Sequence, residues 1–217
     1  MKITYLGHAA FELTLQSGMK IVFDPYTSGA FGTLDHGPIM GEFDAAVVSH
    51  SHEDHCCRDV LSRAKKIINK SGKVTVGGVT IESLMTYHDE TKGSQRGKNL
   101  ISIVNAEGLR AAHLGDLGHT IAAKDFPMLM WVDVMMIPVG GHFTIDASAA
   151  AQIVKALEPR IVIPMHYKTP KVDFPIMPVE NFTKLMDNVK SAGASEIVVT
   201  KETLPATMKV VVLEAAN

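Results

Sequence analysis

Three histidines and an aspartate occur within six positions of this chain, in the pattern His-x-His-x-Asp-His at residues 50–55. An apolar run at 45–48 precedes them, and a helix is expected over about 57–68. The cluster is therefore predicted in a loop at the C-terminal end of a buried strand, where α/β sheets usually hold ligands. Because neutral imidazole and carboxylate are the usual ligands of Zn²⁺ and similar ions, the pattern predicts a metal site. A loop of solvated histidines is the alternative.

In an extended segment alternate side chains face the same way, so His50 and His52 can approach one ion together. Asp54 and His55 follow as the chain turns and can face a second ion. His88 opens another polar loop. Three later apolar segments also run directly into loops with a metal-competent side chain, namely Asp116, His142 and His166. Several strand ends are thus expected to supply ligands to one site.

Hydrophobic periodicity and turn residues predict many short strands and few helices. Strands are expected at 2–6, 11–15, 20–24, 44–48, 101–104, 109–114, 133–138, 160–163, 196–200 and 208–213, with a hairpin over 73–84. Helices are expected at 57–68, at 146–157 after an Asp146 cap, and at 179–192 before Gly193. No linker composition divides the chain, so residues 1–217 are predicted to form one domain whose helices lie outside a layered β core.

Composition restricts the partners and the compartment. The net charge is −2, which provides no electrostatic reason to expect nucleic acid or an anionic membrane as a partner. The two cysteines are adjacent, so no structural disulfide and a reducing, cytoplasmic location are expected. Neither a signal peptide nor a membrane span is expected. A homo-oligomer is compatible with the sequence but is not predicted by it.

The ordered motifs resemble a known family. His50–His55, the later Gly115-Asp116 and the strand-end His166 resemble the metallo-β-lactamase superfamily. Five further segments resemble its compact metal-dependent hydrolases related to L-ascorbate-6-phosphate lactonase: Leu6-Gly7-His8-Ala9, Asp24-Pro25, His88-Asp89-Glu90, Arg96-Gly97-Lys98-Asn99 and the segment 138–144. The resemblance spans about residues 1–170. It implies an α/β (α+β) fold, a four-layer αββα sandwich with the site at one edge.

The resemblance also implies two groups of ligands for two divalent ions. The first would consist of His50, His52 and His88, and the second of Asp54, His55 and His166, with Asp116 bridging both. Histidine-rich ligation suits Zn²⁺, although Mn²⁺, Fe²⁺ or Ni²⁺ would also fit.

Two such ions lower the pKa of a shared water from about 15.7 toward neutrality, so a metal-bridging hydroxide becomes the nucleophile. Asp54 would ligate and also orient this nucleophile. We therefore expect a binuclear hydrolase that cleaves a small anionic ester, either a lactone or a phosphodiester. No Gly-x-Ser-x-Gly motif suggests a serine nucleophile instead.

Other polar residues have expected roles around this site. His142 is a candidate catalytic acid that protonates the leaving group, with substrate binding or a structural role as alternatives. His8 is expected to line the pocket, and Arg96 and Asn99 to bind the anionic substrate, unless they form only an exposed basic turn. Asp24 and His113 are expected to orient the ligands from outside the metal shell.

Two other functions are compatible with the same ligands. One is a metal-dependent ribonuclease or phosphodiesterase of the tRNA 3′-processing type, which the absence of a strongly basic composition disfavours. The other is a metal-binding sensor or scaffold without turnover, which the retained Asp54 disfavours.

Overall fold

Six strands form the first sheet, in the order β13-β1-β2-β3-β4-β5. Their bounds in the computed structural model, which describes residues 1–217, are β1 (Lys2–Gly7), β2 (Ala10–Thr14), β3 (Lys20–Phe23), β4 (Ala45–Val47), β5 (Ile67–Ile68) and β13 (Glu196–Val198). The first three strands form an antiparallel meander, and β4 continues the sheet parallel to β3. All three residues of β4 are buried, as the apolar run predicted for a strand covered on both faces.

Eight strands form the second sheet, in the order β12-β14-β11-β10-β9-β8-β7-β6. Their bounds are β6 (Gly72–Val76), β7 (Val79–Tyr87), β8 (Lys98–Ala106), β9 (Leu109–His113), β10 (Val134–Pro138), β11 (Ile161–Met165), β12 (Val189–Ser191) and β14 (Lys209–Val212). Strands β6 to β9 are antiparallel hairpin partners, whereas β9, β10, β11 and β14 run parallel.

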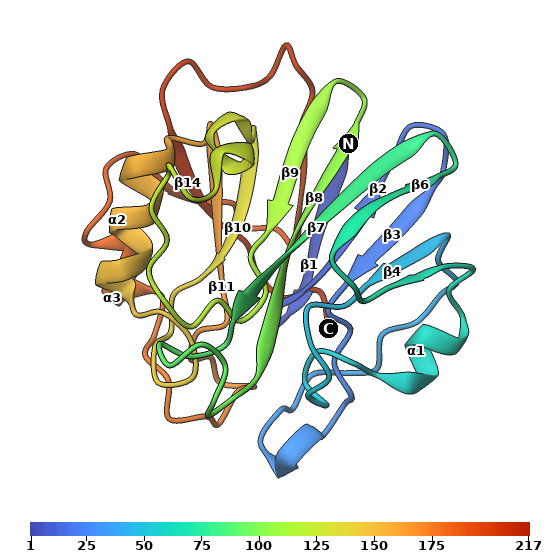
Figure 1. The fold of residues 1–217 in the computed structure, drawn as a ribbon, viewed down its shortest axis with the longest axis horizontal. Coiled ribbons are helices and arrows are strands. Elements are labelled where there is room, and N and C mark those ends of the chain that lie inside the picture. Colours follow the sequence, from blue (N-terminus) through green and yellow to red (C-terminus); the bar gives the residue numbers. More distant parts are fainter.

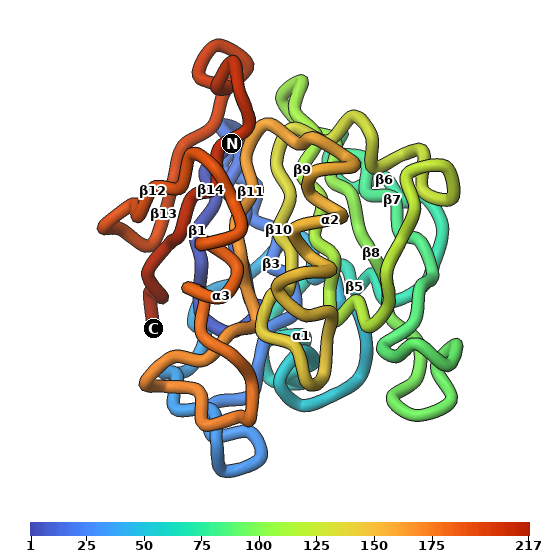
Figure 2. The backbone as a smooth tube through the Cα atoms, turned by 90° about the vertical axis from the view of Figure 1, so that its left-hand side faces the viewer, coloured from blue at the N-terminus to red at the C-terminus, as the bar shows by residue number.

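Helices cover the outer face of each sheet, so the predicted αββα layers are confirmed (Figure 1). α2 (Ala147–Leu157), α3 (Glu180–Thr183) and the 3₁₀ turn η2 (Pro127–Trp131) lie on the second sheet. α1 (Arg58–Ser62) and the loop with the 3₁₀ turn η1 (Ala30–Gly32) lie on the first. Figure 2 shows α2 and α3 in front of the parallel strands. None of the three α-helices has the length and hydrophobicity that crossing a bilayer requires.

The main hydrophobic core lies between the two sheets. It joins Phe11 and Leu13 of β2 to Val104 of β8 and Met136 of β10, all of them fully buried. Burial of each such side chain contributes about 1.5–3 kcal/mol to stability. The core holds the two sheets in fixed relative positions, and therefore also the loops at their edges.

Two predicted helices are shorter than expected. The helix predicted over 57–68 ends at Ser62, because Arg63 donates to the backbone carbonyls of Ile39 and Gly41 and turns the chain. Ile67–Ile68 then pairs with β4 as the edge strand β5. Periodicity could not distinguish these two isoleucines from a continuing helix face.

The helix predicted over 179–192 was also wrong in its second half. α3 ends at Thr183, and Asn188 has a left-handed φ of 53° that is incompatible with a continuing helix. Residues 189–191 pair with β14 as β12. Gly193, predicted as the helix stop, instead has φ 61° in the turn after this strand.

The predicted Asp146 cap is present, since its Oδ1 accepts a hydrogen bond of 2.8 Å from the Ala149 N–H. Asp146→Ala should lower the free energy of unfolding by about 1 kcal/mol, because this N–H loses its partner. Asp146→Asn, which retains an accepting oxygen, should cost less than half as much. Urea denaturation of both variants measures the difference, and equal losses would contradict the capping role.

Candidate metal centre

The metal centre is built from loops that follow the C-terminal ends of five strands in both sheets (Figure 1). His8 follows β1, and the 49–55 loop follows β4. His88, Asp116 and His166 follow β7, β9 and β11. Backbone hydrogen bonds tie the two sheets together here, from His166 N–H to the His8 carbonyl at 2.8 Å and from Leu100 N–H of β8 to the Ser49 carbonyl at 3.0 Å.

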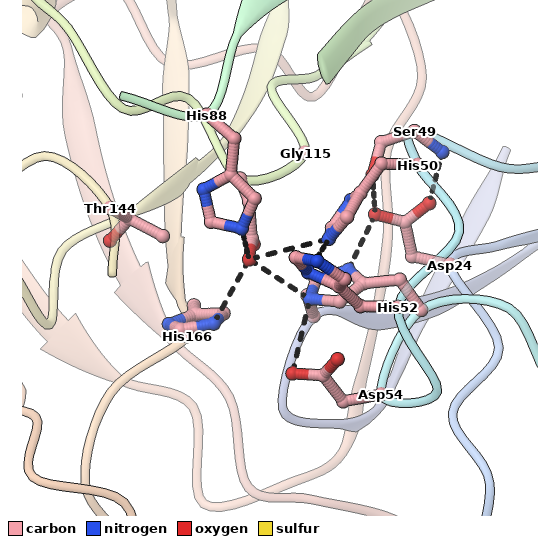
Figure 3. A network of polar contacts seen from close by, with 12 residues as sticks. Asp24, Ser49, His50, His52, Asp54, His88, Gly115, Thr144 and His166 are labelled. Atoms are coloured by element: carbon pink, nitrogen blue, oxygen red, sulfur yellow. Dashed lines mark hydrogen bonds and ion pairs between the residues drawn. The ribbon is translucent and has the colours of Figure 1, made fainter. Parts of the chain in front are cut away.

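Asp116 lies at the centre of the cluster. Figure 3 shows the side chains of His50, His88 and His166, which converge from different loops. Its Oδ2 is 3.1 Å from His88 Nε2, 3.2 Å from His55 Nε2 and 3.4 Å from His166 Nε2. His50 Nε2 is 3.8 Å away. A single carboxylate oxygen thus approaches histidines of both predicted ligand groups, as a bridging ligand must.

Two of the three groups of possible ligand atoms around this carboxylate contain the predicted ligands. In the first, the ligand atoms of His50, His52 and His88 all lie within 4.8 Å of one another. The second group, under the same limit, consists of His8, Asp54, His55 and His166. The structure therefore brings together all seven residues that the resemblance implied as ligands.

His8 is more closely involved than the sequence predicted. It was expected to line the substrate pocket, but its ring is fully buried and its Nε2 is 3.1 Å from Asp54 Oδ2. It also packs against His166, with ring centroids 4.2 Å apart. His8 is therefore a buried partner of Asp54 and His166 within the second group and does not line the cavity.

The unpaired atoms of the cluster fit a divalent cation. His55 Nε2, Asp54 Oδ1 and Asp116 Oδ1 are buried without a hydrogen-bond partner. A buried polar atom without a partner costs about 1–3 kcal/mol, and more when it is charged. Carboxylate oxygen and imidazole nitrogen are the donor set that Zn²⁺ and similar ions prefer, so such an ion would satisfy these atoms together.

The low pKa values of three histidines favour metal binding. Burial, aided by neighbouring His55, lowers the pKa of His50 to about 3, and burial together with His166 lowers the pKa of His8 to about 4. Burial also lowers the pKa of His52. These imidazoles are therefore neutral at pH 7 and keep a lone pair for a metal.

The carboxylates remain charged although they are buried. Burial raises the pKa of the Asp54 carboxyl, but the charge of His55 and the His8 hydrogen bond outweigh it, so the net pKa falls below the usual value. Burial likewise opposes a low pKa at Asp116, and the nearby His166 and His55 again prevail. For His55 the order is reversed: burial lowers its pKa, yet Asp116 and Asp54 raise it well above normal. A cation binding here would replace that proton.

Asp24, which the sequence predicts outside the metal shell, hydrogen-bonds two residues of the 49–55 loop. Its Oδ2 accepts hydrogen bonds from His55 Nδ1 at 2.9 Å and from Ser49 Oγ at 2.6 Å, while Oδ1 accepts from Ser49 N–H at 2.7 Å. Because Nδ1 of His55 donates to this carboxylate, its Nε2 can direct a lone pair toward the cluster. Ser49, which the sequence did not single out, also lies 2.9 Å from His50 Nδ1.

His113, also expected outside the metal shell, hydrogen-bonds the backbone on both sides of its ring. Its Nε2 donates to the Ala9 carbonyl at 2.8 Å, and its Nδ1 accepts from Gly115 N–H at 3.1 Å. These bonds hold the turn before Asp116 against the first sheet.

Asn99 differs from the expectation that it binds substrate. It is fully buried, and its amide donates to Thr86 Oγ1 and to the Leu114 carbonyl, both at 2.9 Å. Its Oδ1 accepts from Asp116 N–H at 2.9 Å. All of its hydrogen-bonding capacity in the site is used to shape the turn that carries Asp116, so it has no free group for a substrate.

His142 lies outside the cluster. It is exposed, has a left-handed φ of 63°, and lines a separate cavity of about 270 Å³ beside Glu90 and Arg96. It does not line the cavity above the ligands, so the structure does not support its predicted role as the acid that protonates a leaving group there.

A cavity of about 410 Å³ opens directly above the ligands. His52, Asp54, His88 and Asp116 form its floor. Its walls are Phe31, Arg96, Phe143 and Phe174. A larger and more open depression of about 820 Å³ lies by Ser17, Lys65 and Gly77, but none of the cluster residues reaches it. The cavity of about 410 Å³ is the candidate active site, because four of the candidate ligands line it.

Comparison with known proteins agrees with this geometry. A model described as the β-lactamase superfamily domain matches residues 2–166. The chain belongs to the metallo-β-lactamase superfamily.

Within the metallo-β-lactamase superfamily, relatives come from several archaea. A UPF0173 metal-dependent hydrolase of Thermococcus onnurineus is 30% identical, over 78% of this chain and 85% of the relative. One from Pyrococcus furiosus is 32% identical over the same shares. Among solved structures, a candidate Zn-dependent hydrolase from Thermotoga maritima is 34% identical, covers 98% of both chains and has a TM-score of 0.79. Human tRNase Z, short form, is 12% identical over 78% of this chain and 93% of its own, with a TM-score of 0.56, a likeness that shows the fold.

Asp89 is a site residue that sequence reasoning missed in this metallo-β-lactamase domain. Its Oδ1 accepts from the Thr91 and Gly93 N–H groups, and its Oδ2 accepts from those of Gln95 and Arg96. One carboxylate thus organises the loop that carries Arg96 into the cavity. Its position directly after His88, at the start of a Gly- and Ser-containing loop, is the only sequence signal for this role.

The position of Asn99 predicts an effect on metal affinity without a direct metal contact. Asn99→Ala should weaken Zn²⁺ binding about 10- to 100-fold, because the turn that positions Asp116 loses its hydrogen bonds. Competition with a chromophoric chelator measures the affinity. Asn105→Ala is the matched control on the same strand, since that side chain bonds Arg110 away from the cluster. Equal affinities of the two variants would contradict the positioning role.

Proposed function

We propose that this chain is a binuclear metal-dependent hydrolase that cleaves a small anionic ester, either a lactone or a phosphodiester. Its membership of the metallo-β-lactamase superfamily and its relatives named metal-dependent hydrolases make it a metal-dependent hydrolase. The observation that carries the binuclear proposal is Asp116 Oδ2, which lies within 3.8 Å of four histidines divided between two ligand groups.

His50, His52 and His88 would hold one ion, and Asp54, His55 and His166 the other, with Asp116 between them. Zn²⁺ is the expected metal, with Mn²⁺, Fe²⁺ or Ni²⁺ as alternatives. When bound, the ions would lower the pKa of water toward neutrality and stabilise the negative charge that develops on the substrate.

The chain's own residues would orient the reaction. Asp54 lines the cavity, and its Oδ2 is held by His8 while its Oδ1 has no hydrogen-bond partner. Oδ1 would therefore ligate the second ion, and the negative charge of Asp54 would orient an incoming water in the cavity toward the scissile ester. Hydrolysis adds the water across the C–O or P–O bond, so the acid keeps the new oxygen and the leaving oxygen receives a proton.

The two ligand groups predict a stoichiometry of two. Protein purified without chelator and reconstituted with Zn²⁺ should contain two metal ions per chain, measured by inductively coupled plasma mass spectrometry. His52→Ala and His166→Ala should each lower the content toward one, because each removes a ligand from a different group. His142→Ala, which lies outside the cluster, should retain two. Fewer than one ion per reconstituted wild-type chain would refute the binuclear proposal.

An Asp54 variant distinguishes an enzyme from a metal-binding scaffold without turnover. Asp54→Asn retains a ligand oxygen but loses the charge that orients water, so ester hydrolysis should fall about 100-fold or more at comparable metal content. The substrate for this comparison comes from a screen of the wild-type protein for hydrolysis of lactones and of the phosphodiester bis-p-nitrophenyl phosphate. Absence of turnover for every ester by the fully metal-loaded wild type would favour the scaffold.

A further inference from the structure

The walls of the active-site cavity are apolar, in contrast to its floor. Three phenylalanine rings come from three separate loops: Phe31 from the segment after β3, Phe143 after β10 and Phe174 after β11. Phe174 lies between the others, with ring centroids 6.1 Å from Phe31 and 5.7 Å from Phe143. Its ring is also edge-on to His8 at 5.5 Å. The aromatic wall therefore begins directly at the metal centre.

Phe31 has an unfavourable conformation for its residue type. Its φ of 57° and ψ of 9° lie in the left-handed region, which bulky side chains rarely adopt, and its side chain is 57% exposed. An exposed aromatic ring in a strained backbone is not explained by core packing. Such strain concentrates at binding sites, and here it places the ring at the mouth of the cavity.

Arg96 provides one cation in the same wall. Its guanidinium lies 5.7 Å from the Phe143 ring centroid, and its backbone N–H is anchored to Asp89 at 2.8 Å. The guanidinium itself has no carboxylate within 4.0 Å, whereas Arg63 pairs with Asp59 and Arg110 bonds Asn105. A positioned guanidinium without a partner is suited to bidentate recognition of a carboxylate or phosphate.

Arg96 and Phe143 line both the active-site cavity and the smaller polar cavity of about 270 Å³ that also contains His142. The guanidinium therefore stands at the boundary between the two cavities. An anionic group bound there would leave the remainder of the molecule facing the phenylalanine rings and the metal centre. A polyhydroxylated sugar would find few hydrogen-bond partners among these rings.

We propose that Phe31, Phe143, Phe174 and Arg96 form a substrate-recognition subsite for an ester that carries an aromatic or branched aliphatic group and one anionic group. This inference rests on the proposed function and deepens it by naming the substrate class. The rings bind the apolar group, and Arg96 binds the carboxylate or phosphate oxygen. Recognition in this subsite does not require turnover, so it can be measured with ligands that have no scissile bond.

The test is equilibrium binding to the Zn²⁺-loaded protein by isothermal titration calorimetry. The three ligands are 3-phenylpropionate, propionate without the ring, and 3-phenylpropan-1-ol without the charge. Wild type should bind 3-phenylpropionate about 10-fold more tightly than either of the others, because only it uses both the rings and the guanidinium.

Variants assign each preference to its residue. Arg96→Gln should weaken binding of both carboxylates about 10-fold and leave the alcohol within about twofold, whereas Arg96→Lys should recover part of the loss. Phe31→Ala should weaken both ring-containing ligands about fivefold and leave propionate unchanged. The matched controls are Arg58→Gln, an exposed arginine on α1, and Met40→Ala, an exposed residue of the same segment as Phe31. Both should bind like wild type.

The outcomes separate the two proposals. Equal affinity of wild type for 3-phenylpropionate and propionate, or an Arg96→Gln variant with normal metal content and unchanged carboxylate affinity, would overturn the subsite. Retained ligand preferences with no turnover of any ester would overturn the hydrolase proposal and leave the subsite standing. Turnover of esters without a ring or charge preference would overturn the subsite alone.

Discussion

The buried carboxylate of Asp116 is the interaction on which the site depends. A carboxylate removed from water is costly unless partners compensate its charge, and here four histidines approach one of its oxygens. Asn99 and His113 fix the turn that carries it, and Asp24 orients His55 toward it. The Asp24 bond directs the His55 Nε2 lone pair toward the cluster, and the other bonds fix the backbone that carries Asp116.

The two-sheet architecture explains why these groups can converge. The core between the sheets sets their separation, and backbone hydrogen bonds from His166 to His8 and from Leu100 to Ser49 join segments that belong to different sheets. The ligands therefore stand on rigid strand ends. The recognition residues Phe31 and Arg96 stand on longer loops, whose shape depends on a strained φ and on the Asp89 carboxylate. Chemistry and selectivity are thus carried by different parts of the fold.

Predictions from the sequence were accurate where a local pattern has a local cause. Alternating or continuous apolar runs predicted most strands, and Asp146 predicted its helix start. The helices at 57–68 and 179–192 were predicted too long, because edge-strand pairing of Ile67–Ile68 and of 189–191 is a long-range interaction that periodicity does not report. The fold class and the candidate ligands came from ordered motifs matched to a family.

The sequence by itself predicted the candidate donor set, because histidine and aspartate at strand ends suit a divalent metal and their order matches a family. Only the tertiary structure decided how the neighbours are used. The side-chain amide of Asn99 hydrogen-bonds the backbone, His8 is buried against Asp54, and His142 lines a separate cavity. These outcomes depend on which loops meet across the two sheets. Spacing along the chain contains no information about such contacts, because they are set by the packing of residues far apart in sequence.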